Sequence, residues 1–484
     1  MRSMAPRIPL DRPASMSDKF GHSLANTLNT TSLPARPAGA QQISTRYAWY
    51  VVLVLMVCYT LSFVDRQILS LLVGPIKHDL AISDTRIGVL QGLAFAVFYT
   101  LAGLPIGRVV DTYGRRNPIA AGIFLWSLMT AACSAAKSFW TLFLARIGVG
   151  VGEATLSPAA FSLISDYFPK EQLGLAISVY TMGIFIGSGV ALAVGGTVVD
   201  AVVRMPALHL PILGIVATWR LSFLLVGIPG LLVVLLVYTV REPLRRNLLR
   251  TADGRAADLG LREVLAQVRM RWQSFTGLAI AMIFQSLASY AFLSWTPAFF
   301  QRIHGWTAGQ AGRALGITLL IFGCSGMYVG GLLCDRWQRQ SIHEAPLRVA
   351  MLSAVGACVF LGIAMLLPNP RASLALMAPG LFFQAMPIGS TYAAIQLIFP
   401  NQVRGLVSAF FMFILNLGGI SLGPLLPGMF NDYLFKNESR LGPSVSLTIV
   451  LACVSMMVIL PLTYRHYRRD YEMMNSAVED SFSK

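Results

Sequence analysis

Apolar segments recur along almost the whole chain, and most of them approach the length that can cross a bilayer. A spanning helix needs about 20 consecutive, mainly apolar residues. The chain therefore predicts an all-α polytopic membrane protein with twelve transmembrane helices. The twelve segments fall at roughly 47–75, 85–108, 117–136, 139–167, 173–199, 214–240, 272–300, 308–333, 347–367, 372–398, 402–429 and 443–463.

The composition agrees with this prediction and excludes several classes of protein. Only 12% of the residues are charged and 55% are hydrophobic, whereas soluble domains carry about 25% charged residues. The net charge of +16 does not indicate a nucleic-acid partner, because the basic residues lie between apolar segments without interleaved aromatics. We find no nucleophile elbow, phosphate loop, histidine-rich cluster or paired cysteine motif. We therefore expect no enzyme activity, no metal and no cofactor.

The basic residues also predict the orientation and the division of the chain. Most of the 38 Lys and Arg residues fall on the side that holds both chain ends, so we expect a multi-pass protein of the cell membrane with both termini cytoplasmic. The predicted parts are a disordered cytoplasmic tail (1–46), an N-terminal six-helix bundle (47–240), a basic cytoplasmic linker (241–271), a C-terminal six-helix bundle (272–463) and a cytoplasmic tail (464–484).

An internal repeat supports two halves of six helices. A short motif follows both the second and the eighth predicted helix, and its two aspartates lie about half of the membrane region apart. The two copies are Gly107-x-x-x-Asp111-x-x-Gly114-Arg115-Arg116 and Gly331-x-x-x-Asp335-Arg336-x-x-Arg339.

Four ionisable residues lie deep inside the first and fourth predicted helices: Asp65, Arg66, Arg146 and Glu153. A charge in hydrocarbon costs at least about 2.5–3.5 kcal/mol, so it is rarely there without a partner or a task. Two acids and two bases could neutralise one another as a structural cluster. They could also bind a proton and an anion, which is the interpretation that we favour.

The helical rise allows these four residues to be ranked by depth. Arg146 is level with Asp65 in the predicted helices, so we expect these two to pair. Glu153 lies about 10 Å below Arg146 on the same helix face, too far for direct contact. Desolvation without a partner favours a proton on a carboxylate, so Glu153 is the first candidate for proton coupling and Asp65 the second.

Twelve helices, a basic central loop and the Gly-x-x-x-Asp-x-x-Gly-Arg-Arg motif resemble the major facilitator superfamily. Within it, FVDR in the first helix, RIGVGVGEA in the fourth and the following FSLISDYFP resemble the Spinster family of sphingolipid and lysophospholipid transporters. The resemblance implies two pseudo-symmetric six-helix bundles, alternating access and a substrate site near the midplane. One departure is Gly187-Ser188, where antiporters carry Gly-Pro; this weakens an antiport reading.

The resemblance also implies a role for the repeated motif in conformational gating. Asp111 would meet the start of the eleventh helix, near Asn401 and Arg404, when the cytoplasmic side closes. Asp335 would be its mirror image near the start of the fifth helix. Ordinary positive-inside topology is the competing explanation for the arginines. The gating candidates are Gly107, Asp111, Gly114, Arg115, Arg116, Asp335, Arg336, Arg339 and Arg404.

The second half carries aromatic and amide residues at mid-depth but no ionisable ones. A charged site facing an apolar, aromatic wall suits a lipid-like amphiphile such as a lysolipid or sphingolipid. The alternative is a proton-coupled symporter of a small organic anion, such as a sugar acid or monocarboxylate, clamped by the two arginines. A monomer is expected. The substrate or ion-pair candidates are Arg66, Arg146, Gln285, Tyr290, Trp295, Tyr392 and Asn416.

Overall fold

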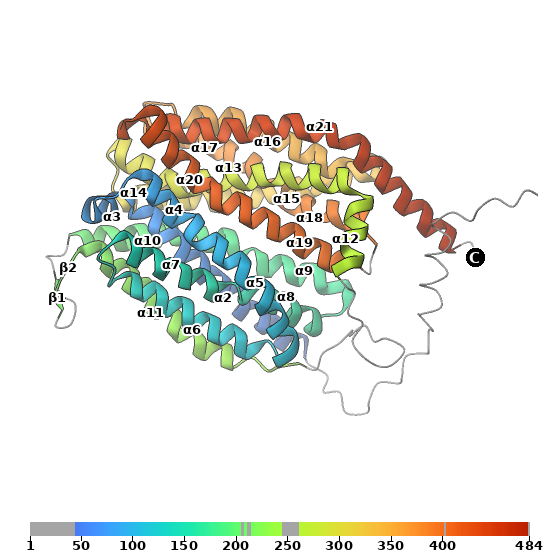
Figure 1. The fold of residues 1–484 in the computed structure, drawn as a ribbon, viewed down its shortest axis with the longest axis horizontal. Helices are drawn as coiled ribbons and strands as arrows, with labels where there is room; N and C mark the ends of the chain where they lie inside the picture. The colour runs from blue at the N-terminus through green and yellow to red at the C-terminus, as the bar shows by residue number, and fades with distance from the viewer. Residues whose placement is uncertain (1–43, 205–207, 211–213, 244–260, 401–402, 483–484) are drawn as a thin grey trace, which may run out of the picture.

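The computed structural model describes residues 44–204, 208–210, 214–243, 261–400 and 403–482. Almost all of the predicted amino-terminal tail and much of the predicted linker lie outside these residues. The described part forms two groups of long helices that lie side by side (Figure 1).

The described residues of the first bundle form six long helical stretches, several of which are divided into two helices. Gly92 separates the two halves of the second stretch, and Ala154 and Thr155 separate those of the fourth. The helices are α2 (Thr45–Leu71), α3 (Val73–Leu80), α4 (Asp84–Gln91), α5 (Leu93–Tyr113), α6 (Arg116–Cys133), α7 (Phe139–Glu153), α8 (Leu156–Tyr167), α9 (Lys170–Thr181), α10 (Gly183–Val203) and α11 (Thr218–Tyr238).

The second bundle follows a short helix, α12 (Leu261–Met270), and repeats this organisation. Pro387 begins a new helix within the tenth stretch, since proline cannot donate the backbone hydrogen bond that would continue the preceding one. The elements are α13 (Trp272–His304), α14 (Ala308–Thr318), η1 (Leu319–Gly323), α15 (Cys324–Arg339), α16 (Ala345–Ala364), α17 (Pro370–Ala385), α18 (Pro387–Ile398), α19 (Arg404–Leu415), η2 (Asn416–Ile420), α20 (Ser421–Met429), η3 (Phe430–Phe435), η4 (Glu438–Arg440) and α21 (Leu441–Phe482).

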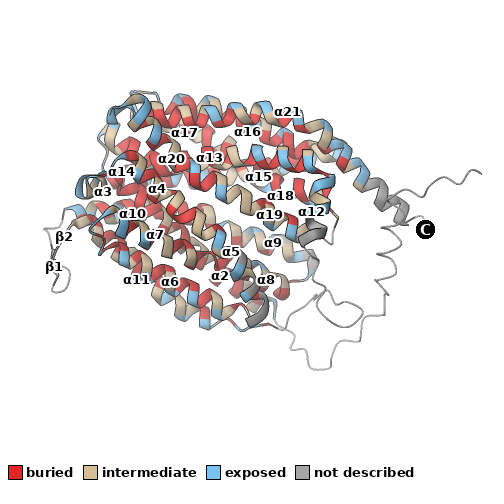
Figure 2. Ribbon diagram, viewed as in Figure 1, coloured by how far each residue is buried: buried red, intermediate tan, exposed pale blue. Residues whose placement is uncertain are grey.

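Eleven stretches of the described residues are long and apolar enough to cross a membrane. The predicted segment 117–136 is absent from this set, and it corresponds to α6, which packs between α7 and α11. The all-α, multi-pass fold predicted from the sequence is thus confirmed. Large apolar side chains such as Trp140, Leu144, Leu232 and Leu235 are exposed. Exposed residues, pale blue in Figure 2, are common on the outer helices, as expected for a surface that faces lipid.

Two boundaries differ from the sequence prediction. The segment predicted to begin at 214 is helical only from Thr218, because Leu208–Leu210 and Gly214–Val216 pair as a small antiparallel hairpin, β1 and β2. The last helix continues far beyond residue 463. Its extension is held against α13, where the Ser274 hydroxyl donates to the buried Asp470 carboxylate at 2.5 Å.

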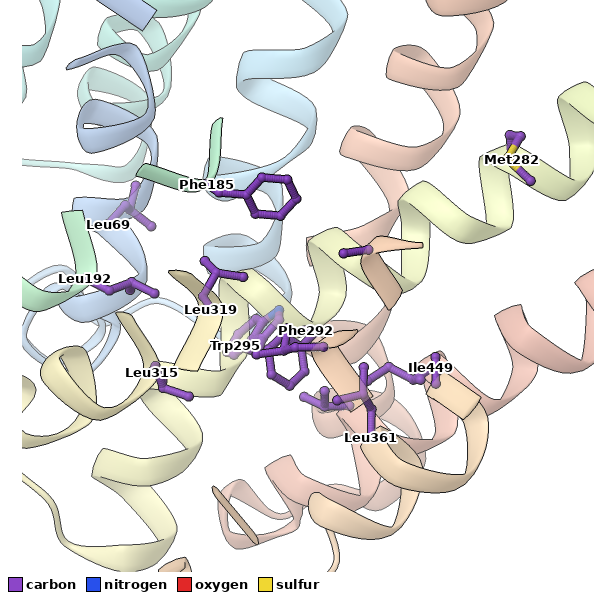
Figure 3. Close-up of a cluster of buried hydrophobic side chains, with 14 of the residues drawn as sticks. Leu69, Phe185, Leu192, Met282, Phe292, Trp295, Leu315, Leu319, Leu361 and Ile449 are labelled. Carbon is purple, nitrogen blue, oxygen red and sulfur yellow. The ribbon is translucent and has the colours of Figure 1, made fainter. Parts of the chain in front are cut away.

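The two bundles meet closely at one end. We call the end that holds Ser44, α12 and the C-terminus the linker end, and the opposite end the far end (Figure 1). Near the far end, α4 packs on α20 and α10 on α14. Glycine permits this approach, since a Cβ at Gly92 would lie only 2.7 Å from the carbonyl oxygen of Ser421. A cluster of buried apolar side chains, including Leu192 and Leu315, continues across the contact (Figure 3).

A buried carboxylate ties the far end together. Asp84 opens α4 in the first bundle and is fully buried. It accepts hydrogen bonds from both terminal nitrogens of Arg302 on α13, at 2.7 and 2.9 Å, and from the Asn431 amide at 2.6 Å. Lys77 lies 2.9 Å from the same carboxylate. In return, Asp432 of η3 accepts from the backbone N–H groups at the start of α4.

The linker end lacks this close contact at the places where glycines line it. A Cβ built at Gly103 or Gly107 of α5, Gly331 of α15 or Gly389 of α18 would meet nothing within 4 Å. The extensive contacts between the bundles are those of far-end helices, such as α4 with α20 and α10 with α14. Among the described residues, no extensive contact joins α8 or α9 of the first bundle to α15, α18 or α19 of the second. This asymmetry is what one state of an alternating structure requires.

We expect Asp84→Asn to weaken closure of the far end. The amide cannot neutralise Arg302 and Lys77, and breaking a buried ion pair on one side typically costs about 3–5 kcal/mol. Spin labels at the exposed Arg204 and Lys436, one in each bundle, should report a longer or broader distance distribution in this variant.

Asp79→Asn is the matched control, because Asp79 bonds only within the first bundle, to Trp219 and Arg220. Its distance distribution should equal that of the unsubstituted protein. Equal distributions in all three proteins would contradict a locking role for Asp84.

Candidate functional site

Arg66 and Glu153 form an ion pair in the middle of the first bundle. The Arg66 Nη2 atom lies 2.5 Å from Glu153 Oε2, and its Nε donates to the same oxygen at 2.7 Å. The Ser62 hydroxyl also donates to that oxygen at 2.5 Å. The other carboxylate oxygen of Glu153 is buried and has no hydrogen-bond partner among the described residues. One acid thus carries three donors on a single oxygen.

Aromatic rings surround the Arg66 guanidinium. Its central carbon lies 4.4 Å from the ring centre of Phe95, 4.9 Å from that of Phe63 and 5.3 Å from that of Tyr99. A cation held over ring faces is stabilised by their quadrupoles, most strongly where water is excluded. The rings therefore allow the arginine to remain charged without a second carboxylate beside it.

Asp65 and Arg146 do not form the expected salt bridge. Arg146 donates from Nη1 to the backbone carbonyl of Asp65 at 3.2 Å, and both side chains are buried. No ion pair of the described residues includes the Asp65 carboxylate. The prediction of this pairing, and of a Glu153 without a contact partner, was wrong. Depth along a helix does not fix which way a long side chain turns, and Arg66 turns toward α7.

Glycines of the fourth stretch bring Glu153 close to its neighbours. A Cβ at Gly150 would lie 2.6 Å from the Phe95 carbonyl oxygen, and one at Gly152 would lie 2.7 Å from the Trp126 backbone nitrogen. Small residues at this spacing let helices approach to backbone contact. The run GVGVGEA thereby packs α7 against α5 and α6 and directs its acid toward α2.

Tyr290 is the second-bundle candidate that reaches the charged site. It lines a space of about 20 Å³ together with Arg66, so α13 closes this space from the opposite bundle. Trp295, by contrast, is fully buried and donates to the carbonyl of Pro424 at 2.7 Å. In this structure Trp295 joins α13 to α20 within the second bundle.

The remaining substrate candidates lie elsewhere. Gln285 donates to the carbonyl of Gln384 at 2.6 Å and is buried between α13 and α17. Asn416 begins the π-helical turn η2 and is partly exposed. Tyr392 belongs to α18, but its side chain lies outside the described part. None of these three is brought to Arg66 by a described contact.

The first copy of the repeated motif stabilises its own bundle. Arg115 is buried and forms ion pairs with Asp166 of α8 and, at 2.7 Å, with Glu242. Glu242 also accepts from the backbone N–H of Arg116 at 2.9 Å and so caps α6. Burial opposes ionisation of Glu242, but these donors outweigh it and hold its pKa below the usual range. Gly114 makes the turn with φ +95°.

The second copy makes fewer contacts. Asp335, Arg336 and Arg339 are exposed at the end of α15, and none forms an ion pair with another described residue. Arg404 donates to the Phe399 carbonyl at 2.7 Å. The side chain of Asp111 lies outside the described part, so its expected contact with the start of α19 stays a prediction.

Sequence reasoning missed the residues that close the far end, Asp84 and Arg302, and the partners of Arg115, Asp166 and Glu242. All four lie at the ends of apolar segments, where charge is ordinarily explained by topology. One signal was available for Asp166, because it lies within the FSLISDYFP run that follows the fourth-helix motif.

Comparison with known proteins gives a consistent family. The family model described as Major Facilitator Superfamily matches residues 55–424. An MFS-type efflux pump of Mycolicibacterium smegmatis is 29% identical over 439 residues, which cover 89% of this chain and 96% of that protein. A probable L-galactonate transporter of Escherichia coli is 26% identical, covering 72% and 75%. The mouse sphingosine-1-phosphate transporter SPNS2 is 25% identical, covering 83% and 73%.

Solved structures give the same result. A bacterial homolog of the human lysosomal transporter Spinster, inward-facing and unoccupied, superposes with a TM-score of 0.72 at 26% identity, covering 89% of this chain and 98% of that one. Its inward-facing, occupied form gives a TM-score of 0.69 at 25% identity. The family model spans well over half of the chain, so the protein belongs to the Major Facilitator Superfamily of transporters and, within it, is similar to the Spinster proteins.

Proposed function

We propose that this transporter moves an anionic, lipid-like amphiphile and couples its movement to protons through Arg66 and Glu153. The observation that carries the proposal is the 2.5 Å contact between these two side chains. Arg66 can bind the anionic group of a substrate only when Glu153 gives it up. A proton on Glu153 removes the charge that holds Arg66, and so favours the anion.

The competition at Arg66 gives a cycle with defined steps. Protonation of Glu153 frees the guanidinium, the substrate anion takes its place, and the loaded site is carried to the other side as the bundles rock. Loss of the proton restores the Arg66–Glu153 pair and expels the anion. Proton and anion then travel in the same direction. Asp65, buried and without an ion pair among described residues, is the second proton candidate.

Two features support an amphiphile as the substrate. The mouse SPNS2 protein, 25% identical, is named a sphingosine-1-phosphate transporter. The charged residues of the site belong to the first bundle, and the described wall opposite includes Tyr290 and Ile420. A phosphate or carboxylate head on Arg66 fits the charged side of this site. The space beside Tyr290 and Ile420 is too small for the apolar body, which would extend away from it.

A small organic anion is the alternative substrate, because a second group of similar proteins is named as transporters of sugar acids. The similar proteins include a probable L-galactonate transporter and a hexuronate transporter of Bacillus subtilis, the latter 25% identical over 79% of this chain. An arginine that binds a carboxylate serves such a substrate equally well.

We further propose that the linker end is cytoplasmic, that the protein lies in the cell membrane, and that the repeated motif gates the linker end. The structure would then be inward-facing. Gly107, Asp111, Gly331, Asp335 and their neighbouring arginines would meet the opposite bundle when that end closes.

Glu153→Gln should bind the substrate anion but lose its response to pH. The amide copies the protonated acid in size and cannot reclaim Arg66 by losing a proton. In the unsubstituted protein, anion binding should weaken by tenfold or more between acidic and alkaline pH. In the variant the affinity should stay constant, and an imposed pH gradient should no longer drive uptake into proteoliposomes.

Asp65→Asn provides the comparison for this experiment, since it neutralises the other buried acid of the site. Under the proposal it keeps a pH-dependent affinity. If the anion affinity depends on pH in Glu153→Gln but not in Asp65→Asn, then Asp65 and not Glu153 is the proton-coupling residue. pH dependence in both variants would reject coupling through these acids.

Gly107→Leu and Gly331→Leu should fold normally but transport slowly. Both positions have room for a side chain in the present state, and a leucine there would hold the linker ends apart. The melting temperature and substrate binding should be retained while the transport rate falls at least tenfold. Gly74→Leu, at an equally open position on α3 near the far end, is the control. Equal rates in all three variants would contradict closure at these glycines.

Cysteine labelling tests the orientation. In a background without the native cysteines, Lys436→Cys should react with an impermeant maleimide on intact cells, because Lys436 is exposed at the far end. Arg468→Cys, also exposed but on the linker-end part of α21, should react only after the membrane is permeabilised. The opposite pattern would invert the topology.

A further inference from the structure

A small space adjoins Arg66 on the side of the closed far end. Both bundles line it, and six of the eight lining residues are polar. The first bundle contributes α2, α4 and α5, and the second contributes α13 and η2. The residues are Arg66, Gln67, Ser70, Gln91, Phe95, Tyr290, Ser294 and Ile420.

The side-chain amide of Gln91, which lines this space, has no hydrogen-bond partner among the described residues. Both its amide nitrogen and its amide oxygen are buried, and neither has a partner among the described residues. A buried polar group without a partner destabilises the folded protein, because nothing replaces the hydrogen bonds that it made to water. The amide would rotate to present its two donors and its acceptor to a group that enters the space.

Three other polar residues that line the space can also form hydrogen bonds with a group that enters it. Gln67 and Ser294 are buried, and no hydrogen bond from either side chain to another described residue is present. Ser70 donates its hydroxyl hydrogen to the Gln67 carbonyl at 2.7 Å, which leaves its oxygen lone pairs free to accept. The space thus combines acceptors and donors within reach of one cation.

The size of the space limits what it can hold. About 20 Å³ accommodates a group of the size of one water molecule, not a ring or an acyl chain. Access from the far end is blocked, since the Gln301 amide donates to the Leu71 carbonyl at 3.2 Å across the bundles and Gly92 abuts Ser421. An entering group must therefore come past Arg66.

We infer that this space is a subsite for a hydroxyl group carried next to the anionic group of the substrate. This inference rests on the proposed function, because it assumes that Arg66 binds the anion. The shared chemistry is a hydroxylated acid. A lysolipid presents it as a glycerol hydroxyl beside the phosphate, and a sugar acid presents it as ring or chain hydroxyls beside the carboxylate.

The test compares hydroxylated probes with their deoxy analogues. Binding of a lysophosphatidate and of a hexuronate, each with its deoxy counterpart, is measured on the purified protein and on Gln91→Leu. The unsubstituted protein should prefer the hydroxylated member of the pair that it binds by about tenfold or more, the effect of a hydrogen bond to a buried group. Gln91→Leu should bind both members with nearly equal affinity.

The two probe pairs also identify the source of the hydroxyl. A preference within the lysophosphatidate pair indicates a lipid head group, and a preference within the hexuronate pair indicates a sugar acid. The melting temperature of Gln91→Leu should be unchanged or raised, because leucine removes an unpaired amide; a purely structural glutamine would lower it. Gln338→Leu on α15, away from the space, should leave the preference intact.

Two outcomes distinguish a failure of the proposed function from a failure of the hydroxyl subsite. If the unsubstituted protein binds neither acid, the proposed function fails. If it binds an acid but shows no preference for the hydroxylated member, or if Gln91→Leu keeps the preference, the hydroxyl subsite is wrong while the proposed function stands.

Discussion

The contact between Arg66 and Glu153 joins two opposite charges inside the first bundle. Two ions buried in a medium of low dielectric constant gain strongly from each other, but each costs several kcal/mol to desolvate. The protein offsets this cost with the Ser62 hydroxyl on the acid and three aromatic rings around the base. These neighbours stabilise the pair inside the membrane-spanning part of the first bundle.

The two ends of the molecule manage the bundle contact differently. At the far end, glycine-lined crossings and the buried Asp84 bring backbone, apolar and ionic contacts together across the bundles. At the linker end, the corresponding glycines Gly107 and Gly331 face open space. A transporter with two states must be able to open the far end and close the linker end. The contacts that close either end must therefore be weak enough to be released.

The two copies of the repeated motif have diverged in what they contact. Arg115 has become a buried link between α8 and the residues that follow α11, through Asp166 and Glu242. The equivalent positions after the eighth stretch are exposed. The helix ends at Tyr113 in the first copy and at Arg339 in the second. The partners available on neighbouring helices decide which copy forms a buried link.

Hydrophobic length and charge placement alone predicted the polytopic helical fold, the two halves and the four intramembrane charges, because a bilayer penalises every departure from an apolar helix. They did not predict which charges pair. Asp65 and Arg66 are adjacent in sequence, yet their side chains leave the helix in different directions, and only the packing of α7 on α5 and α6 decides that Arg66 meets Glu153. Likewise, Asp84 and Arg302 are 218 residues apart and each resembles an ordinary helix-end charge. The contact between Asp84 and Arg302 depends on how the two bundles pack against each other. A sequence pattern within one helix does not contain this information.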